Sequence, residues 1–186
     1  FIAIGLVAGV YPFVVMAGMH HAFTPIKLSM IATTGYEAFI CISEFCSNMA
    51  QGAAALAVTM KTKNKDLKQT AGSSAFSALV AGITEPALYG VTLQNKKALK
   101  GVMAGSGVAG LFVGFVALKA FTVVGPGLAS MSMYIDPENS KNIVYAFIGF
   151  GIAFIVSLVS TMILYKEEKE VINKVEEEIQ LKDMSL

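Results

Sequence analysis

The sequence is poor in charge and contains neither tryptophan nor arginine. Charged side chains make up 15% of its 186 residues, whereas 55% of the residues are hydrophobic and the mean hydropathy is +0.64. A soluble domain normally carries more charge, so the composition places the chain among membrane proteins. All 14 basic residues are lysines, and 13 acids balance them to a net charge of +1. There is no basic patch for a nucleic acid, and we expect no nucleic-acid partner.

Cysteine is equally scarce, and the two cysteines form no recognised motif. Cys41 and Cys46 lie in a hydrophobic segment, without a CxxC spacing and without a nearby histidine. Cysteines in such a setting behave as small apolar packing residues. We therefore expect neither a disulfide nor a metal site, and no cofactor.

Long apolar segments are abundant. A bilayer core of about 30 Å requires roughly 20 apolar residues in a helix. Residues 1–19, 101–123 and 142–165 meet this requirement, and 38–60 is long enough although it contains Glu44 and other polar residues. The start of the chain lacks the basic residues of a signal peptide and is interpreted as a span of a longer polypeptide. The predicted fold class is an all-α integral membrane protein with about four transmembrane helices.

The lysines indicate the orientation, because short lysine-rich loops stay on the cytoplasmic side of a membrane. They cluster at 61–68, at 96–100 and in the tail 166–186. These parts are expected to lie inside. The segment 124–141 contains one lysine and two acids, so it is predicted to be an outer loop.

Two further segments begin and end on one side and are too short to cross the membrane twice. Residues 69–95 lie between two inner loops, and residues 20–37 lie between two outer ends. Each contains a proline at its expected break, Pro25 with Thr24 as the helix cap in one and Pro86 in the other. We predict two re-entrant helical hairpins that enter from opposite faces, which is typical of a transporter site near the midplane.

Glu85 stands directly before Pro86 in the second of these segments. A charged group at the centre of a bilayer costs on the order of 2.5 to 3.5 kcal/mol on insertion scales, so it normally has a partner or a task. The proline interrupts helical geometry and places the carboxylate at the start of a half-helix. Glu85 then either caps that half-helix or accepts hydrogen bonds from a polar ligand.

The helix predicted over 38–60 carries a polar face. At about 100° per residue, the polar side chains fall within roughly 60° of one another. They are Glu37, Glu44, Asn48 and Gln51. Such residues either face a ligand or hydrogen-bond between spans. His20 and His21 end the first span, where histidines are commonly polar anchors, and Lys27 and Lys119 are expected to extend to a membrane interface.

Four stretches of the chain together resemble a known family. They read AGITEPALYGVT (81–92), GMHHAFTPI, NMAQGAAALAV and KTKNKDLKQTAGSSAFSALV. These are similar to the membrane-embedded IIC component of the bacterial phosphoenolpyruvate-dependent sugar phosphotransferase system, in the β-glucoside branch of the glucose superfamily. The resemblance implies that residues 1–165 form the C-terminal, transport half of a homodimeric permease that dimerises through its N-terminal half. Residues 166–186 are then a cytosolic amphipathic tail or linker.

The resemblance also implies a set of sugar-binding residues. The acid of the GITEP motif, Glu85, and the histidine that ends the first span, His20, are expected to bind sugar hydroxyls. His21 ranks below His20. The remaining predicted members are Thr84, Asn48 and Gln51.

The implied partners are a sugar, of the β-glucoside or disaccharide type, the cytosolic IIB and IIA domains and the lipid bilayer. The implied location is the bacterial cytoplasmic membrane, with the C-terminus in the cytoplasm. The phosphorylated cysteine of a IIB domain lies in a motif with arginines, which this chain lacks, and the phosphorylated histidine of a IIA domain is missing too. As part of a protein-phosphocysteine sugar phosphotransferase, the chain is not expected to transfer phosphate by itself.

Two alternatives belong to other classes of protein. An ion-coupled secondary sugar transporter would use Glu85 as a proton carrier, since interrupted helices with a buried acid also suit that class. A membrane scaffold without transport would leave the two opposed re-entrant segments unexplained. Dependence of uptake on phosphoenolpyruvate distinguishes the predicted permease from the ion-coupled transporter.

Overall fold

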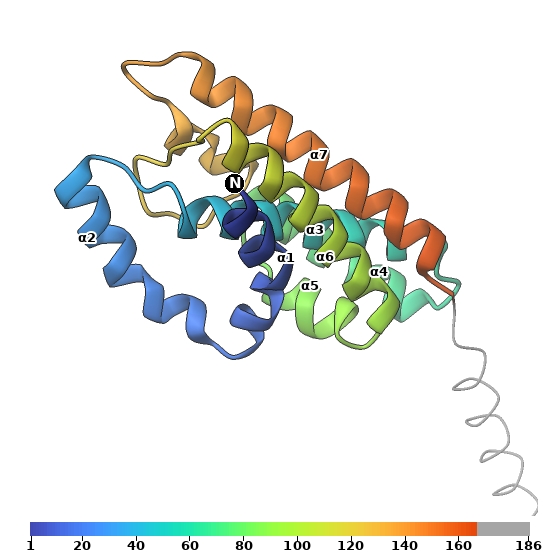
Figure 1. Cartoon of the computed structure of the whole chain (residues 1–186). Coiled ribbons are helices and arrows are strands. Elements are labelled where there is room, and N and C mark those ends of the chain that lie inside the picture. Colours follow the sequence, from blue (N-terminus) through green and yellow to red (C-terminus); the bar gives the residue numbers. More distant parts are fainter. Residues whose placement is uncertain (167–186) are drawn as a thin grey trace, which may run out of the picture.

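The computed structural model describes residues 1–166, which form a helical molecule (Figure 1). Within this range the only strand-like pairing is one isolated bridge between Glu37 and Ala120, so the predicted all-α fold is confirmed. The tail predicted from residue 167 onward lies outside the described residues. The α-helices are α1 (Ile2–Met16), α2 (Thr24–Thr34), α3 (Ile40–Lys61), α4 (Lys65–Phe76), α5 (Glu85–Ala87), α6 (Lys96–Phe115) and α7 (Lys141–Leu164). Tighter or wider helical turns are η1 (Met19–Phe23), η2 (Ser77–Ala81), η3 (Leu88–Thr92) and η4 (Leu128–Tyr134).

Helix α3 forms the centre of the molecule, with α1, α6 and α7 packed around it (Figure 1). Sixteen of its 22 residues are buried, which explains how a helix with several polar residues is accommodated here. Its surroundings are other helices of the chain. The two cysteines, Cys41 and Cys46, are free and buried in this core, which confirms their predicted packing role.

The helices that could cross a membrane are those packed around α3. Among the described helices, α6 and α7 are long and apolar enough to cross a membrane, and α1 passes the same test only together with residues Met19–Thr34, to which it joins at a bend of 117°. The glycine-rich sequence of α6 allows close packing, as predicted. A Cβ added at Gly105 would lie 2.5 Å from the Ser157 Cβ of α7, and one at Gly110 would lie 2.9 Å from the Gly5 Cα of α1.

The predicted span 101–123 differs from the helix that forms. Helix α6 begins at Lys96 and ends at Phe115, and Ala117 adopts a positive φ of 51° directly after it. The chain then continues without helical structure back into the molecule, where Leu118 and Ala120 are buried. Asn142 fixes this return, because its Nδ2 donates to the carbonyl oxygens of Lys119 (2.8 Å) and Tyr134 (2.7 Å).

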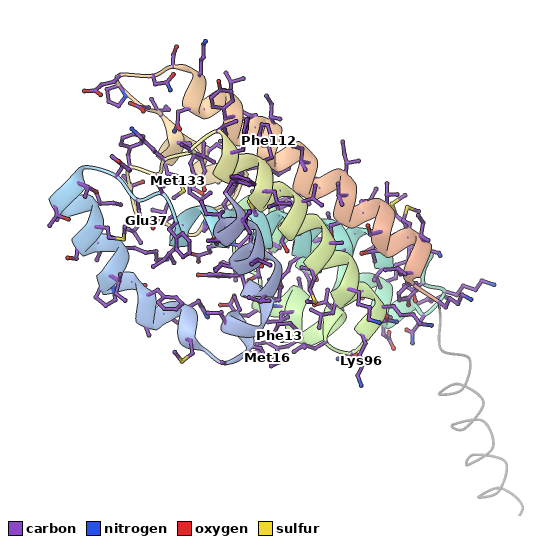
Figure 2. The ribbon with its side chains drawn as sticks, in the orientation of Figure 1. Phe13, Met16, Glu37, Lys96, Phe112 and Met133 are labelled. Carbon is purple, nitrogen blue, oxygen red and sulfur yellow. The ribbon has the colours of Figure 1, made fainter. Side chains whose placement is uncertain are left out.

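The segment 124–141 is more than the outer loop that was predicted. Its Gly125–Gly127 portion packs directly on the backbone of Val80 to Gly82, so that a Cβ on Gly127 would lie 2.5 Å from the Val80 carbonyl oxygen. Met131, Met133 and Tyr134 of η4 belong to the central core cluster. Figure 2 shows Glu37 and Met133 toward one end of the molecule and Lys96 toward the other. The lysine count carried no information about this inward return, and the outer position of the segment stays a prediction.

One of the two predicted interruptions lies where it was expected. In 69–95 the chain leaves helical geometry at Gly82, whose φ is +72°, and resumes it at Glu85. In 20–37 the predicted break at Pro25 is wrong: η1 continues directly into α2, Pro25 lies in the first turn of α2, and the chain breaks before this segment, at Gly18, whose φ is +70°. Thr24 is the first residue of α2 and makes no side-chain cap hydrogen bond, contrary to its predicted role.

Candidate functional site

The interrupted segments meet around one cavity of about 310 Å³. This volume is at the lower end of the range of small-molecule pockets, roughly 300 to 1,000 Å³. Its lining comes from the η1 turn, the start of α2, the second turn of α3, the break before α5 and the inward return after α6. The lining residues are His20, His21, Thr24, Lys27, Glu44, Gly82, Ile83, Glu85, Val123, Val124 and Gly125. Nonhelical backbone is tolerated inside a membrane protein where it lines such a cavity.

Glu85 presents its carboxylate to this cavity. It is the first residue of α5, and Pro86 follows it in the first turn of the helix. Its Oε1 lies 3.2 Å from Nε2 of His20, and 40% of the Glu85 side chain is exposed. The carboxylate therefore contacts a side chain from another segment and keeps room for a further partner.

His20 and His21 are held together on the η1 turn. Their ring centroids are 4.0 Å apart, and the ring planes are tilted by 40°. The His20 side chain is only 12% exposed. Its Nδ1 is buried and has no hydrogen-bond partner within residues 1–166. When Nε2 carries the proton, Nδ1 is a buried acceptor that no group of the described residues satisfies.

The ligand atoms of His20, His21 and Glu85 all lie within 4.8 Å of one another, which is close enough to compare with a metal site. Histidines that bind a metal normally donate their other ring nitrogen to a second acceptor, which fixes the ring. His20 has no such acceptor within the described chain. The arrangement suits an uncharged polar ligand with several hydroxyl groups better than a cation.

A buried ion pair forms the opposite wall of the cavity. The Lys27 Nζ donates to Glu44 Oε2 over 2.7 Å, and the two side chains are 6% and 13% exposed. The expectation that Lys27 extends to a membrane interface is wrong, because a carboxylate of α3 neutralises it inside the protein. Lys119, for which the same was expected, lies with its Nζ 4.3 Å from the centre of the Tyr36 ring.

The structure places the other predicted residues outside the cavity lining. Thr84 is buried and precedes α5 without a side-chain cap bond. The Asn48 Nδ2 donates to the carbonyl oxygens of Gly82 (3.0 Å) and Pro126 (3.3 Å), and so joins the break before α5 to the inward return after α6. Gln51 is fully buried and donates to Ser47 Oγ over 3.3 Å, with its own Oε1 unpaired.

Glu37, which the polar pattern assigned to the same helix face, instead precedes α3. Its carboxylate accepts hydrogen bonds from the backbone amides of Phe39, Ile40 and Cys41 over 2.6 to 2.9 Å. These are amide groups that a helix start leaves without internal partners. Glu37, which is labelled in Figure 2, therefore has a structural role at the start of α3.

The fold and cavity together define a helical membrane protein with a polar small-molecule site at interrupted helices, the class to which solute transporters belong. The comparisons agree with this class. A family model described as "Phosphotransferase system, EIIC" matches residues 1–105, which is more than half of the chain. The chain belongs to this family.

Relatives of the chain carry names from the same system. It is 36% identical over 167 residues to the arbutin-, cellobiose- and salicin-specific EIIBC component of Escherichia coli, with 90% of this chain and 34% of the relative covered. It is 35% identical over 168 residues to the β-glucoside-specific EIIBCA component of Bacillus subtilis, with 90% and 27% covered. A sucrose-specific EIIBC component of Bacillus subtilis is 32% identical over 172 residues, with 91% and 36% covered. The chain thus spans about a third of the length of these relatives, and no solved structure matches it.

Proposed function

We propose that the chain forms the sugar-binding and translocating part of a permease of the phosphoenolpyruvate-dependent phosphotransferase system. The observation that carries this proposal is the Glu85 carboxylate, held 3.2 Å from His20 at the wall of a cavity where helices are interrupted. A carboxylate accepts strong, charge-assisted hydrogen bonds from hydroxyl groups. A sugar ring offers several such groups.

The residues nearest to the ligand in this proposal are Glu85 and His20, with His21 and Thr24 beside them. Of the residues predicted as further contacts, Asn48 acts from behind the cavity by holding Gly82, which lines it. Gln51 and Thr84 are buried outside the lining. The substrate is a β-glucoside or a disaccharide, in line with the names of the relatives.

Phosphorylation requires groups outside this chain. A cytosolic IIB domain would supply the phosphocysteine and a IIA domain would recharge it, and the relatives are named EIIBC and EIIBCA components. Movement of the sugar site within a homodimeric permease would expose the bound sugar to the IIB domain. The sugar phosphate then carries a charge that the acidic site does not favour, so it leaves on the cytoplasmic side.

The contacts at one end of the molecule support an orientation in the bacterial cytoplasmic membrane. Lys61 donates from its Nζ to the carbonyl oxygens of Met162 (2.6 Å) and Tyr165 (2.9 Å). The lysine-rich loop after α3 and the end of α7 therefore lie on one side, which supports a cytoplasmic position for both and for the C-terminus.

Sugar binding to the full-length permease tests the proposal. Isothermal titration with arbutin, salicin, cellobiose, sucrose and trehalose should identify at least one ligand, and Glu85→Ala should abolish its binding while the protein stays in the membrane. Retained binding by Glu85→Ala would refute the assigned site. Uptake that persists without phosphoenolpyruvate and collapses with an uncoupler would instead establish proton coupling.

A further inference from the structure

Helix α2 has little to hold it in place except one ion pair. It runs along the edge of the molecule, apart from α6 and α7 (Figure 1). Within its eleven residues, all of them described, Lys27 is the only buried one, whereas Ile26 and Leu28 are exposed. Apolar packing therefore contributes little to the position of α2 against the described part of the chain.

The Lys27 ammonium reaches from α2 to the Glu44 carboxylate near the start of α3, 17 positions further along the chain. The N–O distance is 2.7 Å and both side chains are largely buried. Taking two charges out of water is costly, and an apolar pair of similar volume often serves stability as well. A buried ion pair is therefore better explained by the definite geometry that it imposes than by added stability.

That geometry matters for the cavity. Helix α2 follows the η1 turn without a gap, so the direction of α2 and the position of His20 and His21 are coupled. Lys27 and Glu44 also line the same cavity as Glu85. If α2 moved away from α3, one wall of the cavity would open and the histidines would shift relative to Glu85.

We propose that Lys27 and Glu44 are positioning residues, whose ion pair seats α2 on α3 and thereby sets the distance between His20 and Glu85 in the sugar site. The consequence for sugar affinity rests on the proposed function, whereas the seating of α2 does not. The pair acts through the histidines. What matters is therefore that Lys27 and Glu44 pair with each other, and neither needs to contact the ligand.

The experiment uses the full-length permease, with its cysteines outside this chain replaced, and two readouts. The first is the distance distribution between spin labels at Ser29→Cys on α2 and Ile155→Cys on α7, both exposed positions; the native Cys41 and Cys46 are buried and should not be labelled. The second is the dissociation constant of the sugar identified by titration. The variants are Lys27→Met, Glu44→Gln, the charge swap Lys27→Glu with Glu44→Lys, and the apolar pair Lys27→Met with Glu44→Met.

Each single variant should broaden the label distance and weaken sugar binding about tenfold or more, because it leaves one buried charge or amide unpaired. The charge swap and the apolar pair should restore a narrow distance and recover most of the affinity. Lys119→Met is the matched control, because this lysine lies outside the cavity lining, and it should change neither readout.

The outcomes that overturn the inference are distinct. A narrow distance in Lys27→Met, or affinity within twofold of the wild type, would show that the pair does not position the site. Restored distance without restored affinity in both double variants would show direct contact with the ligand instead. If no variant and no wild type bound any sugar, the proposed function would fail, and the distance measurement would still decide whether the pair seats α2.

Discussion

Two regions of the molecule are held together by different means. In the bundle of α1, α3, α6 and α7, glycine and alanine allow backbones to approach closely, and the contacts are apolar and extensive. Around the cavity, the segments are short and interrupted and are joined by single polar contacts, of which His20–Glu85 and Lys27–Glu44 are the clearest. Close packing gives one stable arrangement. Polar contacts can be exchanged for a ligand, and a site that must bind and release needs this property.

The largest expected effect comes from breaking the close packing of the bundle. Gly105→Leu would place side-chain atoms where a Cβ alone lies 2.5 Å from the Ser157 Cβ and 2.8 Å from its backbone nitrogen. Because backbone cannot move aside, we expect the variant to yield no monodisperse permease in size-exclusion chromatography. Gly151→Leu on α7 is the control, since a Cβ there has no neighbour within 4 Å, and it should behave as wild type. Equal yields from both variants would contradict the packing argument.

Next in size is the loss of the cavity carboxylate. Glu85→Gln should weaken sugar binding roughly 10- to 100-fold, because a hydrogen bond to a charged group contributes about 1.5 to 3 kcal/mol. The thermal unfolding midpoint should change little, since the carboxylate is part of no apolar contact in the bundle. Isothermal titration measures the first quantity and a thermal melt the second. Glu138→Gln, an exposed acid outside this cavity, is the control, and a loss of binding there would speak against a local effect.

A third variant tests the joint between the two regions. Asn48→Leu removes the hydrogen bonds to the carbonyl oxygens of Gly82 and Pro126, leaving acceptors in the interior without a partner. We expect a loss of about 1 to 3 kcal/mol in stability. It should appear as a lower unfolding midpoint together with weaker sugar binding. A variant with normal stability but no binding would show that Asn48 contacts the ligand.

The smallest effect is expected one turn further along α3. Gln51→Leu removes one bond to Ser47 but also an unpaired buried oxygen, and these changes offset each other within about 1 kcal/mol. The unfolding midpoint and the sugar affinity of this variant, measured beside those of Asn48→Leu, compare two neighbouring amide side chains of one helix. A loss of binding in Gln51→Leu would place that side chain in the sugar site after all.

Much of the fold could be predicted because hydropathy and helix length are properties of contiguous residues. The span 142–165 corresponds to α7, and the position of Pro86 within an apolar segment predicted the break that precedes α5. The end of α6 at Phe115 could not be predicted, because residues 116–123 are as apolar as the helix before them. The helix ends because the following chain is held by other partners. The Lys119 amide donates to Asn142, and Ala120 pairs with the backbone of Glu37.

Part of the site was also predictable from short stretches of contiguous residues. Glu85 and His20 were selected from motifs, and the structure brings them into contact. The importance of Lys27 and Glu44 was missed, although a lysine and a glutamate in two apolar segments could have suggested a pair. The lining by Val123, Val124 and Gly125 had no signal at all, because Val123 ended a predicted span and the other two began a predicted outer loop.

The sequence by itself determined that this is a membrane protein, that a helix breaks before Pro86 and that an acid stands at this break, because composition and proline act locally. Only the tertiary structure decided which polar groups meet. Asn48 joins the break before α5 to the return after α6, Glu37 caps a helix and Glu44 neutralises a lysine, although all three are polar residues in or beside the same helix. The physical reason is that a polar side chain inside a membrane protein must find a partner, and the partner is set by how distant segments pack.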